Sequence, residues 1–228
     1  MVSGQQGKGA PAGNAGVPLP WDDLDLLMFT LTADEIIQRI HLNKYGSSQF
    51  NGDDRGNARF SPIYDANGSI IPTMYAGITK ECAMMETIYH DVPFAPGLKT
   101  LDKSRLRDKN LSTLQVQTDL LLVDLSSVGL RKLGLQKSQL IETEKDRYPD
   151  TRQWAEAIHK QTGEEVKGLS WISKQDDSAR AYLFFGDRVS SVTFTCTGSH
   201  DLTKHEPTYE SALALADLIG VNIIDGLT

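Results

Sequence analysis

The 228-residue chain has few of the residues that form disulfide frameworks or metal clusters. It contains two cysteines, Cys82 and Cys196, and neither belongs to a CxxC pair. Its five histidines are scattered, and the closest pair, His200 and His205, has no obvious third ligand nearby. The number and spacing of the cysteines and histidines therefore argue against a disulfide scaffold and a zinc cluster, and we expect no metal site.

Long apolar runs and excess positive charge are missing as well. No stretch approaches the roughly 18 apolar residues of a membrane span, and the amino terminus lacks the apolar core of a signal peptide. The formal net charge is -7, so neither nucleic acid nor an anionic membrane would be attracted to the surface. We expect a cytoplasmic protein without a nucleic-acid or membrane partner, in which any phosphate site is local.

The pattern of elements indicates one domain after an arm. Residues 1–20 are rich in Gly, Ala, Pro and Gln and predict a disordered arm, whereas residues 21–228 are enough for one core. Helices are predicted at 21–29, 80–91, 150–163 and 206–218. Strands are predicted at 73–78, 120–125, 168–172, 181–185 and 189–195, with a hairpin between the last two. Because no regular βαβ alternation appears, we predict an α+β fold with a mixed, mostly antiparallel sheet and flanking helices.

Residues 32–42 are ambiguous from their pattern alone. TADE resembles a capping box that would start a helix, while IIQRIHL carries β-branched residues in partial alternation. If the segment is a strand, Ile37, Arg39 and His41 share one face and Ile36, Ile40 and Leu42 share the other.

Five short motifs follow one another along the chain. They are QRIH with Arg39, GNARFSP with Arg59, MYAG with Tyr75, AMMETIYH with Glu86 and GLSWIS with Ser173. In this order they resemble the RES-domain family over roughly residues 34–187, and the similarity is greatest from MYAG to AMMETIYH. The last motif carries Trp171 where a tyrosine is more usual in the family.

The resemblance implies a function and a fold. Characterised members of the family degrade NAD+ and often act as toxins paired with an antitoxin. It therefore implies a cleft similar to that of ADP-ribosyltransferases, NAD+ as the substrate, and an antitoxin protein that covers the cleft. It also favours a strand for residues 32–42, with the face of Arg39 toward the cleft and the face of Ile40 toward the core.

The motif residues suit cleavage of the bond between nicotinamide and ribose. Glu86 shares an otherwise mostly apolar helix stripe and could offset the positive charge that develops on the ribose. Arg39 and Arg59 could bind the diphosphate through their guanidinium forks, and Tyr75 could stack on nicotinamide or hydrogen-bond a ribose. The resemblance adds Ser173 and its neighbour Trp171 as substrate-binding residues. Glu86, Arg59 and Tyr75 are the expected catalytic set.

The sequence leaves the acceptor of ADP-ribose open. No GxGxxG or GxxxxGK[ST] pattern is present, so NAD+ would be consumed as a substrate rather than carried as a cofactor. Arg55, between Gly52 and Gly56, and Lys174 predict a pocket for inorganic phosphate, which favours phosphorolysis slightly over hydrolysis. The alternatives are ADP-ribosylation of a protein target and a binding module without turnover.

Overall fold

The computed structural model describes residues 16–226 and contains one eight-stranded sheet with the strand order β1-β8-β9-β10-β5-β2-β7-β11. The strands are β1 (Met28–Leu31), β2 (Ile36–Leu42), β5 (Thr73–Gly77), β7 (Lys109–Val116), β8 (Leu120–Asp124), β9 (Val166–Ile172), β10 (Arg180–Phe185) and β11 (Phe194–Asp201). Only β8 and β9 run parallel among the neighbours in this sheet. The predicted mixed, mostly antiparallel α+β fold is confirmed.

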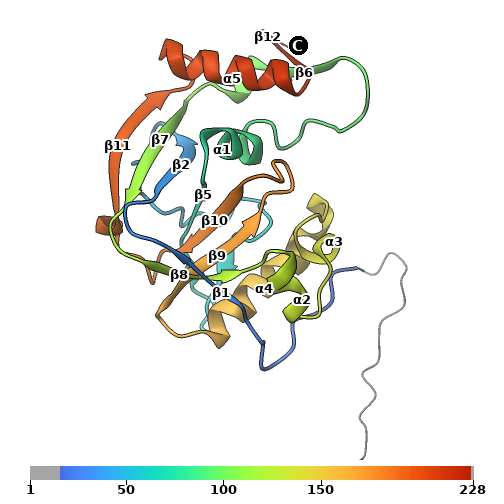
Figure 1. Ribbon diagram of the computed structural model, residues 1–228, viewed down its shortest axis with the longest axis vertical. Coiled ribbons are helices and arrows are strands. Elements are labelled where there is room, and N and C mark those ends of the chain that lie inside the picture. Colours follow the sequence, from blue (N-terminus) through green and yellow to red (C-terminus); the bar gives the residue numbers. More distant parts are fainter. Residues whose placement is uncertain (1–15, 227–228) are drawn as a thin grey trace, which may run out of the picture.

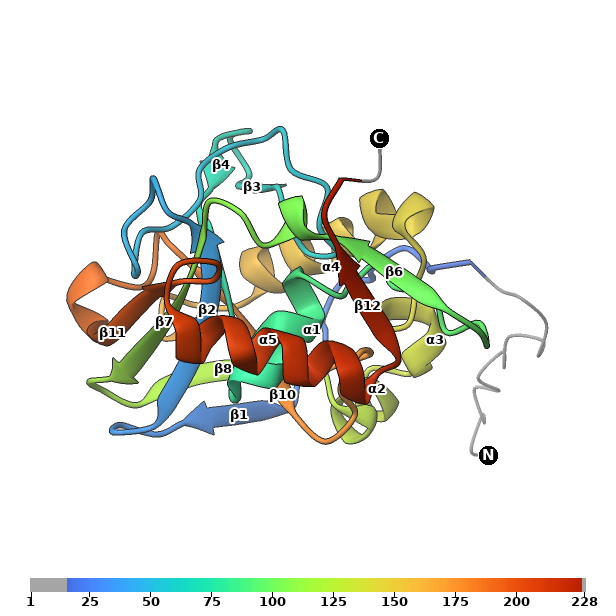
Figure 2. The ribbon, with the colours of Figure 1, turned by 90° about the horizontal axis from the view of Figure 1, so that it is seen from above.

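Smaller elements cover this sheet. The helices are α1 (Lys80–Thr87), α2 (Ser127–Lys132), α3 (Lys137–Leu140), α4 (Tyr148–Gln161) and α5 (Glu206–Leu218), and three 3-10 turns are η1 (Lys103–Arg105), η2 (Lys145–Arg147) and η3 (Ser191–Thr193). Two further pairs are antiparallel β3 (Ile63–Tyr64) with β4 (Ile70–Ile71) and parallel β6 (Lys99–Asp102) with β12 (Val221–Ile224). Figure 1 shows α1 at the centre, between α5 above and α2, α3 and α4 below. In Figure 2, α5 crosses in front of α1.

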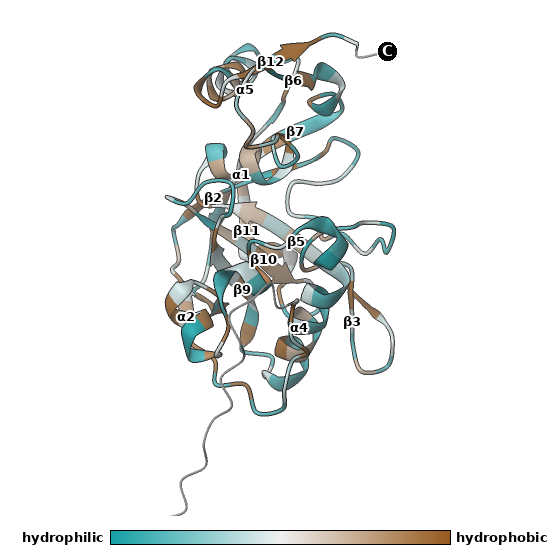
Figure 3. Ribbon diagram, turned by 90° about the vertical axis from the view of Figure 1, so that its right-hand side faces the viewer, coloured by the Kyte–Doolittle hydropathy of each residue, from teal (hydrophilic) through white to brown (hydrophobic). Residues whose placement is uncertain are grey.

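The pleat of the sheet separates two apolar cores. Tyr75 pairs with Leu183 and Ala181 pairs with Trp171, so these side chains share one face and join the core beneath α4. Met74 and Tyr182 point to the other face, into a second core. Helix α4 carries both hydrophobic and hydrophilic residues along its length, as Figure 3 shows, because only one side of it is buried. Within residues 16–226, no helix combines the length and apolar character that a membrane crossing requires.

The predicted helix over residues 21–29 is wrong. Residues 21–27 carry no helix, and Met28 begins β1, which pairs with β8. The apolar spacing instead serves an extended segment that lies along α4: Trp21 packs edge-on against Trp154 at 4.9 Å, and Gln161 bonds both the Leu24 amide and the Trp21 carbonyl at 2.9 Å. Of the predicted arm, residues 1–15 lie outside the described residues. Residues 16–20 are described, and Pro18 accepts a hydrogen bond of 2.7 Å from the Trp154 indole.

The predicted hairpin after β10 is also wrong. Both edges of β10 are already occupied, by β9 and by β5, so the next strand cannot pair with it. Gly186 and Asp187 lie instead in a turn in which Arg188 and Val189 donate to the Phe185 carbonyl. The chain then passes through η3, and β11 joins β7 at the far edge of the sheet.

Helix α1 begins as predicted and ends earlier. The Thr79 side chain accepts from the Cys82 amide at 3.0 Å, which satisfies one of the free N–H groups of the first turn. At the other end, the amides of Ile88 and Tyr89 both bond to the Met84 carbonyl. The helix therefore stops at Thr87 instead of continuing to residue 91.

Candidate active site

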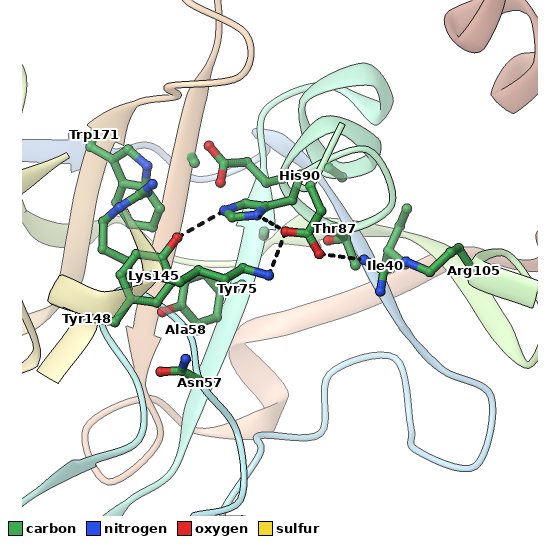
Figure 4. A pocket seen from close by; sticks show the side chains of 16 residues that line it. Ile40, Asn57, Ala58, Tyr75, Thr87, His90, Arg105, Lys145, Tyr148 and Trp171 are labelled. Atoms are coloured by element: carbon green, nitrogen blue, oxygen red, sulfur yellow. Dashed lines mark hydrogen bonds and ion pairs between the residues drawn. The ribbon is translucent and has the colours of Figure 1, made fainter. Parts of the chain in front are cut away.

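A cavity of about 340 Å³ lies between the sheet, the carboxyl-terminal half of α1 and the beginning of α4. Its volume falls at the lower end of the range typical of small-molecule sites, ~300–1,000 Å³. Lining residues come from eight segments of the chain: Ile40, Asn57, Ala58, Arg59, Tyr75, Ala76, Ala83, Glu86, Thr87, His90, Asp91, Arg105, Lys145, Tyr148, Trp171 and Ala181. Figure 4 shows these side chains. Four of the six predicted site residues, Arg59, Tyr75, Glu86 and Trp171, line the same cavity.

Ser173 holds the carboxylate of Glu86 at this cavity. Glu86 lies one turn after Ala83 on α1, and its Oε1 accepts a hydrogen bond of 2.6 Å from the Ser173 hydroxyl. The same hydroxyl oxygen accepts from the amides of Gln175 and Asp176, each at 3.0 Å. Because Ser173 is fully buried and its one proton is directed at Glu86, the carboxylate is fixed before any ligand binds.

Arg59 supplies a buried cation with unused donors. Its side chain is almost fully buried, and none of the residues described offers a hydrogen-bond acceptor to its Nε or Nη2. The guanidinium lies 5.7 Å from the centroid of the Tyr148 ring. An unsatisfied buried guanidinium costs folding free energy. An anionic ligand with oxygen acceptors would remove that cost.

Aromatic side chains form the wall beside Arg59. Tyr75 and Trp171 meet edge to face with ring centroids 6.1 Å apart, and the Tyr75 hydroxyl accepts from the Phe60 amide at 3.0 Å. Burial raises the pKa of Tyr75 to about 12, so its hydroxyl keeps its proton at ordinary pH. The indole Nε1 of Trp171 is buried and has no partner within the described chain. A flat aromatic ligand with a polar edge fits this wall.

Arg39 does not join the others, and the predicted orientation of its strand is wrong. Gln38 pairs with Gly77, which places the even residues of β2 on the face of Tyr75, and Ile40 lines the cavity. Arg39 is buried on the opposite face, where it donates to the Ser47 carbonyl at 2.7 Å and burial lowers its pKa to about 10. Its placement gives no support to a contact with the diphosphate.

The predicted phosphate pocket is not formed. Arg55 pairs with Asp53, which lies two residues before it, and its side chain is largely exposed in a separate shallow depression that Gly52 also lines. Lys174 follows Ser173 but bonds Glu144 at 2.9 Å and does not line the cavity. Local ion pairs occupy both cations, so this prediction is wrong.

Sequence reasoning missed several charged or polar residues of the cavity. Tyr148 begins α4, and Lys145 lies in the turn before it; Arg105 ends η1. His90 is the last residue of the glutamate motif, and Asp91 directly follows it. The spacing of four between Glu86 and His90 was the one available signal, since the others come from segments without a motif. Over residues 16–226, no three His, Cys, Asp or Glu side chains are grouped in a way that could hold a metal ion.

The Ser173–Glu86 bond leads to a testable expectation. In Ser173→Ala the carboxylate loses its partner, and the amides of Gln175 and Asp176 lose their acceptor, so turnover should fall by ~10-fold or more. Steady-state kinetics with NAD+ would measure this, with Ser178→Ala as the control because Ser178 lies in the same loop and bonds only Asp176. Equal kinetics of the two variants would contradict the role of Ser173.

Comparisons with known proteins identify the fold and the family of this chain. The chain is similar in fold to the crystal structure of the M. tuberculosis MbcT–MbcA toxin–antitoxin complex, with a TM-score of 0.56 and 16% sequence identity over 81% of this chain and 92% of the matched chain. No curated protein matches the sequence. The model of the RES domain matches residues 36–203, which include all five motifs. This chain belongs to the RES domain family.

Proposed function

We propose that the protein cleaves NAD+ between nicotinamide and ribose and passes ADP-ribose to an acceptor. The observation that carries this proposal is the Glu86 carboxylate, held by Ser173 at 2.6 Å, in the same cavity as the buried guanidinium of Arg59, whose Nε and Nη2 have no hydrogen-bond partner among residues 16–226. A fixed anion and a free cation suit a substrate that develops positive charge at one end and carries phosphate further along.

The cleavage step uses these groups in defined roles. The bond between ribose C1′ and the pyridinium nitrogen breaks, and its electron pair neutralises the departing nicotinamide. Positive charge develops on the ribose ring, where the Glu86 carboxylate stabilises it by roughly 2 to 4 kcal/mol, the usual worth of one preorganised group. Arg59 binds a phosphate oxygen with its free Nε and Nη2 donors. Tyr75 and Trp171 contact the nicotinamide ring.

The biological consequence we propose is toxicity controlled by a partner. Loss of NAD+ would stop growth of the cell in which the enzyme acts. The structural neighbour was solved as a toxin–antitoxin complex, and this chain shares its fold and belongs to the RES domain family. An antitoxin protein that covers the cavity would prevent NAD+ from entering, and the cytoplasm is the expected site of action.

A second candidate is transfer of ADP-ribose to a protein, because it shares the same first step. The release of nicotinamide distinguishes the two candidates. An enzyme that passes ADP-ribose to water or phosphate releases nicotinamide without a protein target, whereas a protein ADP-ribosyltransferase releases it only when its target is present. A binding module without turnover would free none under either condition.

The acceptor is tested by a phosphate titration with product masses. Because the predicted Arg55–Lys174 pocket is not formed, we place water before inorganic phosphate. The expected result is free ADP-ribose at a rate that added phosphate leaves unchanged. ADP-ribose-1″-phosphate and a rate that rises with phosphate would assign an NAD+ phosphorylase instead.

A further inference from the structure

Tyr148, His90 and Asp91 form a hydrogen-bonded chain along the cavity wall. The Tyr148 hydroxyl lies 3.1 Å from His90 Nε2, and His90 Nδ1 lies 2.9 Å from Asp91 Oδ1. All three line the cavity that contains Glu86. Figure 4 shows His90 between Tyr148 on one side and the ion-paired carboxylate on the other. The motif chemistry uses none of the three.

The direction of these hydrogen bonds follows from Asp91. Partial burial alone would raise the pKa of Asp91, but hydrogen bonds from Lys145 and His90 outweigh it and lower the pKa to about 2. Arg105 adds a third contact at 3.1 Å. An ionised carboxylate only accepts, so His90 Nδ1 carries the proton of that bond, and in the neutral imidazole Nε2 accepts from Tyr148. The imidazole is thus held with its basic nitrogen toward a hydroxyl in the cavity wall.

One hydrogen bond to the His90 backbone and several charged groups surround this arrangement. Gln175 donates to the His90 carbonyl at 3.2 Å. The other charged groups near the chain are Glu144 and Lys145 before α4, Arg105 in η1, and Arg59 and Glu86 in the cavity wall. Tyr148 is almost fully buried, and desolvation raises the pKa of its phenol, so the phenol remains a proton donor to Nε2 at neutral pH.

We propose that Tyr148, His90 and Asp91 form a proton relay that accepts the proton of the attacking water. The proposal rests on the proposed cleavage of NAD+. As the water oxygen bonds to ribose C1′, its O–H bond breaks and the proton passes to the Tyr148 oxygen. The proton of Tyr148 moves to His90 Nε2, and the resulting imidazolium faces the Asp91 carboxylate. His90 then releases this proton to solvent, because its side chain is partly exposed. Tyr148 is the catalytic residue, while His90 and Asp91 act through it.

The relay has the same order of groups as the catalytic triads of hydrolases, a hydroxyl, an imidazole and a carboxylate that orients the imidazole. The relay gives proton removal to residues other than Glu86 and Arg59. Glu86 stabilises the positive charge of the ribose and Arg59 binds phosphate, so neither needs to remove a proton. General base catalysis of this kind is worth ~10²–10⁴-fold in rate.

The test compares Tyr148→Phe, His90→Gln and Asp91→Asn with Tyr64→Phe, a half-exposed tyrosine of β3 that does not line the cavity. Nicotinamide release from NAD+ is measured against pH, with thermal unfolding as the check on folding. We expect Tyr148→Phe and His90→Gln to lose ~100-fold. The pH profile of His90→Gln should differ from that of the wild type, because the variant has no imidazole to accept the proton from Tyr148.

Azide provides the second readout, because it attacks as an anion and has no proton to lose. Added azide should restore nicotinamide release in Tyr148→Phe and His90→Gln and give the ADP-ribosyl azide, and it should not restore Glu86→Gln. A purely structural defect would not respond to azide. The relay is overturned if Tyr148→Phe keeps the wild-type rate and pH profile, or if azide restores neither relay variant. Failure of the wild-type protein to release nicotinamide overturns the proposed function itself, and the relay with it.

Discussion

Nicotinamide release is expected to fall by at least ~100-fold when Glu86 is replaced by glutamine, while the protein stays folded. The amide oxygen of glutamine can still accept the hydrogen bond from Ser173, so geometry and helix propensity are preserved. What disappears is the negative charge beside the developing oxocarbenium ion. If the wild-type enzyme depletes NAD+ in its host, the variant should also be produced in larger amounts.

Glu81→Gln is the matched control. Glu81 lies on the same helix, is half-exposed beside Lys80 and does not line the cavity. Both variants should unfold at nearly the temperature of the parent, and only Glu86→Gln should be inactive. A folded Glu86→Gln protein with near-parental nicotinamide release would remove Glu86 from the mechanism.

The second large effect concerns Arg59, where loss of activity should come without loss of stability. Arg59→Lys keeps the charge but loses the planar fork, and catalytic efficiency should fall by ~10-fold or more. Arg59→Met should lose at least ~100-fold. Because two guanidinium nitrogens are buried without a partner, the methionine variant should unfold at the same temperature as the parent or higher.

Arg39 provides the contrast. Its Nη1 already donates to Ser47 on the opposite face of the sheet, so Arg39→Met should lower the unfolding temperature. Turnover per folded molecule should stay near that of the parent. Destabilised but active Arg59→Met would mean that Arg59 has a structural role, and the phosphate contact would have to be sought elsewhere in the cavity.

The sequence predicted a helix or strand correctly where its formation depends on the residues within that helix or strand. Helix α5 was predicted at its observed bounds, with Gly220 after its end, and β8 follows from the continuous apolar run that begins at Leu120. The cap at Thr79 is also local. Elements that depend on distant partners were misjudged. The amphipathic spacing of residues 21–29 is satisfied by α4, more than 100 residues later, and the hairpin fails because β5 already occupies an edge of β10.

The site residues were likewise predicted correctly where a local motif marks them and missed where their placement depends on distant segments. The order of motifs identified Arg59, Tyr75, Glu86, Ser173 and Trp171, which the structure brings to the cavity or its immediate support. The face of Arg39 depends on a strand register, since one residue of shift turns every side chain over. That register is set by the pairing of β2 with β5 and cannot be read from β2 alone. The chain of Tyr148, His90 and Asp91 joins two segments about 60 residues apart, which share no sequence signal.

The most direct test of NAD+ cleavage is incubation of the purified protein with NAD+ alone, followed by mass spectrometry of the products. We predict stoichiometric release of nicotinamide and ADP-ribose, with none from Glu86→Gln prepared in parallel. Intact NAD+ after incubation with a folded wild-type protein would contradict the proposed cleavage.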